Sequence, residues 1–449
     1  MTYQATITAG VVMIACMAST QCMAENRGVQ AAVPLREVDR DIDAVRPKLI
    51  TWRRDIHSHP ELSGQEVRTS RLVAEHLRAL GLDVTTEVGG HGVVGVLRGG
   101  RPGKVVALRA DMDALPVKEA TGLPFASTVT APYMDERAPV MHACGHDGHT
   151  AILMGVAEVL ARRKASIPGT VKFIFQPAEE GVSDPRAGDA KIGAAAMIAQ
   201  GVMDRPKVDA IFALHIGPVL PTGTVGYRSG PLLGSADAFE IKIQGKGTHG
   251  GLPWKGIDPV ITSAEVLVDL QTIVSRQLDI NKEPAVISVG SIHGGNRANI
   301  IPDSVTMLGT LRTFDDAMRV DAKNRIATIT ESVANAHGAK GEVHFVAQGT
   351  SVTSNDAALT ERMIPALLLA TNGKAVVTAK LSGTEDFSEY QKMVPGVYVF
   401  LGAPPKGKTP ETAPPNHSPL FDFDEDAMPV GVRTLTTLAL DYLASPSAK

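Results

Sequence analysis

The chain has 449 residues, of which 44% are hydrophobic and 20% are charged, and its formal net charge is −4. This length exceeds what one hydrophobic core usually holds, so we expect two domains. The near-neutral balance, without a run of Lys or Arg, argues against nucleic acid and anionic membrane surfaces as partners.

The first 24 residues carry no charge. Their apolar run at 9–18 has the length of a signal-peptide core, and Ala24 ends a small-x-small cleavage site. We therefore expect a signal peptide at 1–24 and an exported, periplasmic or secreted protein. The missing positive charge leaves an ordinary apolar extension open, and Cys16 leaves a lipoprotein anchor open. No later stretch is apolar for long enough to span a membrane.

The next part of the chain alternates helical and strand patterns. Helical periodicity fills most of 34–80 and is broken at Pro60, and a further helix is expected at 150–160. Apolar runs at 93–97, 105–110, 171–175 and 210–214 are typical of buried strands. Three of these runs lead directly into polar side chains: Asp111 and Asp113, Glu179 and Glu180, and His215. Open α/β sheets bind ligands at the carboxyl ends of their strands, so we expect these side chains to meet.

The segment 141–149 concentrates groups that bind transition metals. A lone buried Cys or His is usually an ordinary core residue. Five candidate ligands within eight residues favour a metal site instead, and thiolate and imidazole suit Zn, Mn, Co or Ni. The five are His142, Cys144, His146, Asp147 and His149.

The adjacent carboxylates Glu179 and Glu180 suggest a division of labour. If the chain stays extended, neighbouring side chains point to opposite sides. One carboxylate can then bind a metal ion while the other faces a bound water, as a metallohydrolase requires. The alternatives are a solvated acidic loop here and turn-capping roles for Asp111 and Asp113.

A separate pattern begins after a Gly- and Pro-rich stretch at 218–234, which we interpret as a hinge. Strands at 239–244, 285–293, 305–313 and 342–347, with helices at 259–276 and 317–337, give the β-α-β-β-α-β order of a ferredoxin-like unit. A helix at 359–370, a strand at 398–401 and a helix at 426–443 follow. The predicted fold is α/β, with a mixed, mainly parallel sheet flanked by helices. We place the catalytic domain at 34–232 and 349–445 and the inserted α+β domain at 233–348.

Taken together, these stretches resemble the M20 family of metallopeptidases and, within it, the amidohydrolase branch. That branch includes hydrolases of hippurate, auxin–amino acid conjugates and other N-acyl amino acids. The similarity runs from about 47 to 445. The matching stretches are 53–57, 59–61, 109–116, 141–150, 176–181, 214–215, 247–251, 299–303, 385–387 and 417–419.

The resemblance implies a site with two divalent metal ions (Zn, Mn, Co or Ni). Glu179 matches the general base, and Asp113 matches a carboxylate that helps to fix the metal site. The wider family has a bridging aspartate where this chain has a cysteine. The implied metal ligands are Cys144, His146, Glu180, His215 and His417.

The inserted domain resembles the family's lid and dimerisation domain, which implies a homodimer or higher homo-oligomer. His249 matches a histidine that reaches a neighbouring subunit's active site; capping of the helix near Asp258 is the alternative. Asn299 and Arg312 are our candidates for binding the substrate's carboxylate, although Arg312 can equally be an ordinary surface residue. Trp254 replaces a histidine usual in the branch, so we do not expect substrate preference to carry over from relatives.

The expected reaction is hydrolysis of the amide bond of a small N-acyl amino acid or peptide-like substrate. Glu179 would take a proton from the metal-activated water and pass it to the leaving amine, while His249 stabilises the oxyanion. Two alternatives stay open. One is a dipeptidase or aminopeptidase of the same family, and the other is a metal-binding protein that has lost catalysis.

Overall fold

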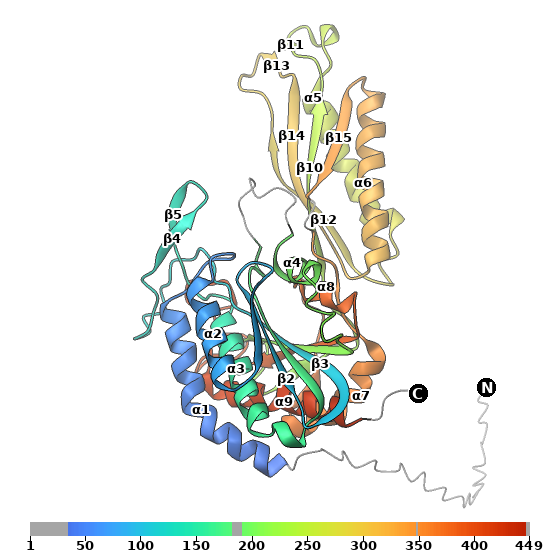
Figure 1. Cartoon of the computed structure of the whole chain (residues 1–449). Coiled ribbons are helices and arrows are strands. Elements are labelled where there is room, and N and C mark those ends of the chain that lie inside the picture. Colours follow the sequence, from blue (N-terminus) through green and yellow to red (C-terminus); the bar gives the residue numbers. More distant parts are fainter. Residues whose placement is uncertain (1–34, 182–190, 347–348, 446–449) are drawn as a thin grey trace, which may run out of the picture.

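The computed structural model describes residues 35–181, 191–346 and 349–445 (Figure 1). A large α/β domain surrounds an eight-stranded sheet, and a smaller domain with a four-stranded antiparallel sheet projects from it. The predicted signal peptide at 1–24 lies outside the described residues. Among the described helices, none combines the length and the apolar character needed to cross a membrane.

The large sheet is mixed, as predicted. Its strand order is β1-β2-β6-β3-β7-β18-β8-β17, and the four central strands β6, β3, β7 and β18 run parallel. Strand β2 runs antiparallel to both of its neighbours, β1 and β6. Strand β8 runs antiparallel to β18 but parallel to β17. The bounds are β1 Asp83–Val88, β2 Gly92–Arg98, β3 Arg101–Asp111, β6 Pro168–Gln176, β7 Ala210–Gly217, β8 Val225–Tyr227, β17 Ala375–Val377 and β18 Gly396–Gly402.

Helices cover both faces of this sheet. The main core joins the sheet to α1, α2, α3, α7 and α9, while α4 and α8 close a second core on the other side. Helix α3 is buried over nearly its whole length because it lies between the sheet, α1 and α9. The bounds are α1 Leu35–Ser58, α2 Val67–Ala79, α3 His146–Arg162, α4 Gly193–Ala199, α7 Ala357–Ala370, α8 Phe387–Gln391 and α9 Met428–Ala444.

The smaller domain, called the lid below, has the predicted β-α-β-β-α-β order. Its sheet order is β12-β14-β10-β15, and alternate residues of β10 are buried in a core shared with both helices. A short pair, β11 with β13, lies at the tip farthest from the large domain (Figure 1). The bounds are β10 Ser235–Gln244, β11 Thr248–His249, α5 Pro259–Thr272, β12 Ala285–His293, β13 Ile300–Ile301, β14 Ser304–Thr313, α6 Asp316–Ala336 and β15 Lys340–Phe345.

The structure refines several predicted elements. Strand β7 continues past the predicted end, so His215 lies inside it. Helix α5 passes into a π-helical turn at Ile273–Gln277, which ends one residue beyond the predicted helical stretch. The predicted hinge at 218–234 contains β8 and also β9 (Gly230–Leu233), which pairs with β16 (Thr353–Asn355). A hairpin, β4 (Thr130–Tyr133) with β5 (Glu136–Pro139), projects beside the site. The exact domain boundaries stay predictions.

Candidate metal centre

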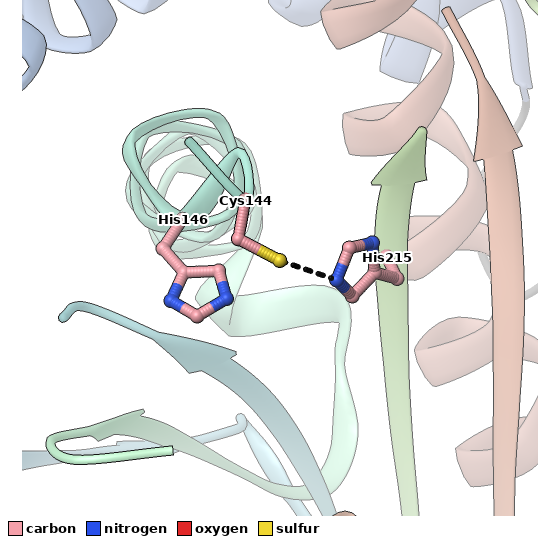
Figure 2. Close-up of side chains that lie close together, drawn as sticks. All are labelled: Cys144, His146 and His215. Carbon is pink, nitrogen blue, oxygen red and sulfur yellow. Dashed lines mark hydrogen bonds between the residues drawn. The ribbon is translucent and has the colours of Figure 1, made fainter. Parts of the chain in front are cut away.

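Residues from three elements meet at the carboxyl edge of the large sheet. Cys144 lies just before α3, His146 is the first residue of that helix, and His215 projects from β7 (Figure 2). The Cys144 Sγ atom is 3.4 Å from His215 Nε2. One ligand atom from each of the three residues lies within 4.8 Å of the others. Of this trio, only His215 was expected at a strand end. His146 connects it to the other strand-end residues, because ligand atoms of His146 also lie within 4.8 Å of those of Asp111, Glu179 and Glu180.

A second set of possible ligands shares Cys144 with the first. Ligand atoms of Cys144, Glu180 and His417 also lie within 4.8 Å of one another. His417 Nε2 is 3.0 Å from Glu180 Oε1, and the imidazole is 55% exposed, so this side of the centre is open. Asn416 supports the arrangement because its side-chain amide donates to the backbone carbonyl of Cys144.

The five candidates of the 141–149 segment separate into different environments. Cys144 and His146 face the centre. His149 donates from Nδ1 to Asp111 and accepts at Nε2 from the backbone N–H of Ile216, so both of its ring nitrogens are used. The other two, His142 and Asp147, point elsewhere: Asp147 pairs with Arg53 and His57, and both His142 nitrogens are buried without a hydrogen-bond partner.

The hydrogen bonds of two histidines leave Nε2 available for a metal ion. His146 Nδ1 donates to the backbone carbonyl of Asp113 at 2.9 Å, and His215 Nδ1 donates to that of Ile216 at 2.7 Å. In the neutral rings Nε2 is then unprotonated, and an N–H held by a carbonyl is the usual support of a metal-binding histidine. The Nε2 atom of His146 is buried without a hydrogen-bond partner. This donor set fits a transition-metal cation.

Glu179 and Glu180 follow β6 in a turn, not in an extended segment, and Ala178 before them has a φ of +52°. Oxygens of both carboxylates therefore lie within 4.8 Å of a His146 nitrogen. The opposite orientation expected of an extended chain does not apply. Asp113 accepts from the hydroxyl of Ser63 at 2.6 Å and from the backbone N–H of Glu180 at 3.0 Å. Asp113 thus braces Glu180 and His146, in keeping with its predicted supporting role.

Arg109 is a buried hub to which the sequence analysis gave no role. Its guanidinium donates to Asp111, Glu385, Asp386 and the side chain of Gln176, and thereby ties together the ends of β3 and β6 and the segment before α8. An arginine inside an apolar strand pattern was the available signal, because a buried charge needs partners.

Burial and neighbouring charges shift the pKa values of Cys144, Glu179 and His146 at the centre. Burial and the carboxylates of Glu180 and Glu179 raise the pKa of Cys144 well above its ordinary value. Burial and repulsion from Glu385 and Glu180 raise the pKa of Glu179 in the same way. Burial acts to lower the pKa of His146, but Asp111 and Asp113 outweigh it and raise that pKa to about 10. Excess negative charge at a buried place of this kind favours a bound cation.

The three predicted lid residues do not join this centre within one chain. His249 lies on β11, where its Nδ1 accepts from the N–H of Gly251, and it shares a cavity of about 780 Å³ with Asn299 at the lid tip. Arg312 lies near the other end of β14, roughly 26 Å along the strand from Ser304 at about 3.3 Å per residue. The proposed capping of α5 by His249 is wrong, because Asp258 accepts from Val260 and Ile261 there.

Comparisons with known proteins agree with this geometry. Residues 107–441 match the sequence profile of peptidase family M20/M25/M40. Thermostable carboxypeptidase 2 of Saccharolobus solfataricus is 40% identical over 409 residues, which cover 91% of this chain and 98% of that protein. N-acetylcysteine deacetylase of Bacillus subtilis is 38% identical over 402 residues, which cover 89% and 98%.

A solved structure supports the same assignment. The Bacillus subtilis YXEP protein, described as a dinuclear metal binding peptidase from the M20 family, has a TM-score of 0.73 and 35% identity to this chain. The match covers 89% of this chain and 99% of that one. Sequence, fold and donor geometry therefore lead to one conclusion: the chain belongs to the amidohydrolase branch of peptidase family M20 and is a hydrolase.

Proposed function

We propose that this enzyme hydrolyses the amide bond of N-acyl amino acids at a centre for two divalent cations. The observation that carries the proposal is the pair of donor sets that share one thiol. Cys144 belongs both to the set with His146 and His215 and to the set with Glu180 and His417. These five residues would hold the two cations, and Cys144 would be common to both donor sets. Names of relatives, a carboxypeptidase and an N-acetylcysteine deacetylase, support amide substrates of this class.

The chain's own groups suit the remaining steps. Cations at these donors would polarise the amide carbonyl and acidify a bound water. Glu179 lies within reach of the same donors, so its carboxylate can take the water's proton and hand it to the leaving amine. Arg109 and Asp113 contribute by holding Glu385, Glu180 and His146 in place.

We further propose that the lid completes the site from another subunit. His249 and Asn299 lie together at the lid tip, far from the donors of their own chain (Figure 1). The neutral His249 ring accepts at Nδ1 and so carries its proton on Nε2, where it can donate to an oxyanion. A homodimer in which each lid tip reaches the partner's centre would use both residues.

The test is an activity screen with protein reconstituted separately with Zn, Mn, Co and Ni. N-acetyl and N-benzoyl amino acids should be hydrolysed, whereas free dipeptides should be poor substrates. Preference for free dipeptides would favour the dipeptidase alternative instead. Stoichiometric metal binding without turnover of any substrate would favour a metal-binding protein that has lost catalysis.

A further inference from the structure

A cavity of about 270 Å³ borders Glu180 and Gly181 but not Glu179. Among the described residues that line it, Glu180 is the one that carries a charge, and Ser63, Gln65 and Ala114 also border it. Most of its other lining residues have apolar or aromatic side chains, namely Leu62, Leu115, Pro116, Pro132, Tyr133 and Met134. The cavity therefore opens beside a predicted metal ligand, and the part of the chain that the structure describes offers it apolar contacts and no cation.

The fold builds this wall from three segments and fixes them by hydrogen bonds. Gln65 donates from its side chain to the carbonyl of Pro132 and so ties the loop after α1 to the β4–β5 hairpin. The backbone N–H of Ala114 donates to the carbonyl of Glu61. Beneath the hairpin, Tyr133 packs on a small buried cluster that contains Leu62 and Ala114. The cavity is thus preformed, as small-molecule sites usually are.

A second cavity, of about 560 Å³, borders both Glu179 and Glu180 and has a different character. Its lining includes the cations Lys191, Arg319 and Lys392 together with hydroxyl groups and carboxylates. The acidic pair thus lies between an apolar cavity and a charged one. An N-acyl amino acid has the same asymmetry, with an uncharged acyl group on one side of the amide and a carboxylate on the other.

The two halves of such a substrate are not interchangeable in the first cavity. A carboxylate there would lie near Glu180 with no cation among the described lining residues, and burying an unpaired charge is costly. An acyl group would instead remove apolar surface from water, at about 25 cal/mol per Å². An apolar cavity of about 150 Å³ is enough to bind benzene, so 270 Å³ has room for an aromatic or medium-length acyl group.

We propose that this cavity is the acyl-binding subsite and that Tyr133 and Met134 of the β4–β5 hairpin determine which acyl groups it accepts. The proposal rests on the proposed hydrolysis of N-acyl amino acids. The hairpin takes part in neither donor set and so can change without disturbing the metal ligands.

The test compares Tyr133→Ala and Met134→Ala with a matched control. Met134 and Met393 are equally exposed, at 50% and 53%, but Met393 does not line the cavity, so Met393→Ala is the control. Met134 has a φ of +52°, and alanine retains its Cβ atom, so the backbone strain is unchanged. The readout is kcat/KM for N-benzoyl against N-acetyl derivatives of one amino acid, with reconstituted protein.

We expect Tyr133→Ala to lower the benzoyl-to-acetyl ratio about tenfold and Met134→Ala to lower it about threefold, in line with the modest value of single apolar groups in a pocket. Met393→Ala should leave the ratio unchanged. The preference among amino acids bearing the same acyl group should stay constant in all variants. An unchanged acyl ratio in both hairpin variants, or a shift in amino-acid preference instead, would overturn the proposal.

A binding experiment separates this proposal from the proposed function. The dissociation constants of N-benzoylglycine and N-acetylglycine are measured for the metal-loaded Glu179→Gln protein with and without each hairpin substitution. If no acyl amino acid is hydrolysed by the parent enzyme, the proposed function fails. Selective weakening of N-benzoylglycine by Tyr133→Ala or Met134→Ala would still support the subsite. Equal weakening of both ligands, or no binding of either, would overturn it.

Discussion

The centre at the edge of the large sheet and the tip of the lid are built in opposite ways. At the centre, His146 is fully buried, and its ring is oriented by the backbone carbonyl of Asp113. At the tip, His249 and Asn299 are exposed and line an open cavity of about 780 Å³. His146 at the centre is therefore oriented by its own chain, whereas His249 and Asn299 at the lid tip face solvent.

This difference indicates which parts of the reaction a single chain can prepare. The metal donors and the proton acceptor need orientation better than about 1 Å, and the large domain orients His146, His215 and Glu180 through hydrogen bonds to backbone groups. The lid tip lies far from them (Figure 1), so it can contribute only to another chain or after a large movement. We therefore expect substitutions in the two regions to reduce turnover by different factors. We also expect a second subunit to restore activity only where the lid tip acts across subunits.

The largest effect should come from Glu179→Gln. The amide retains the shape of the side chain but cannot accept the water's proton, so turnover should fall by roughly 10²–10⁴-fold or more. The metal content, measured by elemental analysis, should remain that of the parent protein. Near-normal kcat in a metal-replete Glu179→Gln protein would remove Glu179 from the role of general base.

The next largest effect should come from His249→Ala. Loss of one oxyanion donor typically lowers kcat by about 10²–10³-fold, and the metal content should again be unchanged. Asn335→Ala, at an exposed position of α6, is a control within the same domain and should keep its activity. A His249→Ala enzyme with full kcat would show that the lid tip takes no part in the reaction.

Mixing the two inactive variants tests the arrangement directly. If the lid tip acts across subunits, a heterodimer of His249→Ala and Glu179→Gln has one site that carries both substitutions and one that carries neither. Activity should then return as subunits exchange, which can be followed with differently tagged chains. Exchange without any return of activity would mean that His249 does not act on a partner's centre.

How much the sequence could predict follows the same division. The parallel strand pattern was enough to place Asp111, His215 and the Glu179–Glu180 pair at one edge, because such strands end on the same side of a sheet. Ligand type and spacing alone could not separate the five candidates of 141–149, and only the family resemblance selected Cys144 and His146. His142 and Cys144 precede α3, whereas the other three lie in its first turn, so the partners of each depend on tertiary packing.

The hub at Arg109 and the position of the lid tip required the three-dimensional structure for similar reasons. Arg109 has partners near residues 176 and 385, which no local pattern connects. His249 was identified through family resemblance alone. The residues around it in the sequence do not predict how far it lies from the metal centre. The hydrophobic periodicity was enough to predict a strand at β10 of the lid, because burial alternates there every two residues.

The buried charges behind the centre should make stability depend on pH. Burial acts to lower the pKa of His57, but hydrogen bonds to Asp147 and Glu119 outweigh it and raise that pKa to about 9. The folded state therefore favours the protonated ring. Its contribution to the free energy of unfolding is complete below an unfolded pKa of about 6.5 and is lost as the pH rises towards 9. We expect a decline on the order of 1–3 kcal/mol, at about 1.4 kcal/mol per pKa unit.

His76 provides a control of opposite sign in the same domain, because burial lowers its pKa. Its contribution should fall as the pH drops below about 6.5, since the unfolded state then binds the proton more readily. Urea unfolding of the parent, His57→Gln and His76→Gln proteins at several pH values separates the two trends. A His57→Gln difference that does not shrink between about pH 6.5 and 9 would contradict a charged His57.

The smallest effect concerns the reactivity of Cys144 and distinguishes a metal-bound thiolate from a merely buried thiol. The side chain is 7% exposed, and burial and nearby carboxylates raise its pKa, so the metal-free thiol should be protonated at neutral pH. Alkylation after chelation should then be slow near pH 7 and accelerate about tenfold per pH unit, because only the thiolate reacts. In the metal-loaded protein the sulfur is held by the cations, so the rate should stay low across the same range.

Cys144→Asp protein corrects for labelling of Cys16 and Cys22 in the full chain. Equal rates and equal pH slopes with and without metal would mean that Cys144 is no ligand, and the centre would then have to be assigned without a bridging sulfur.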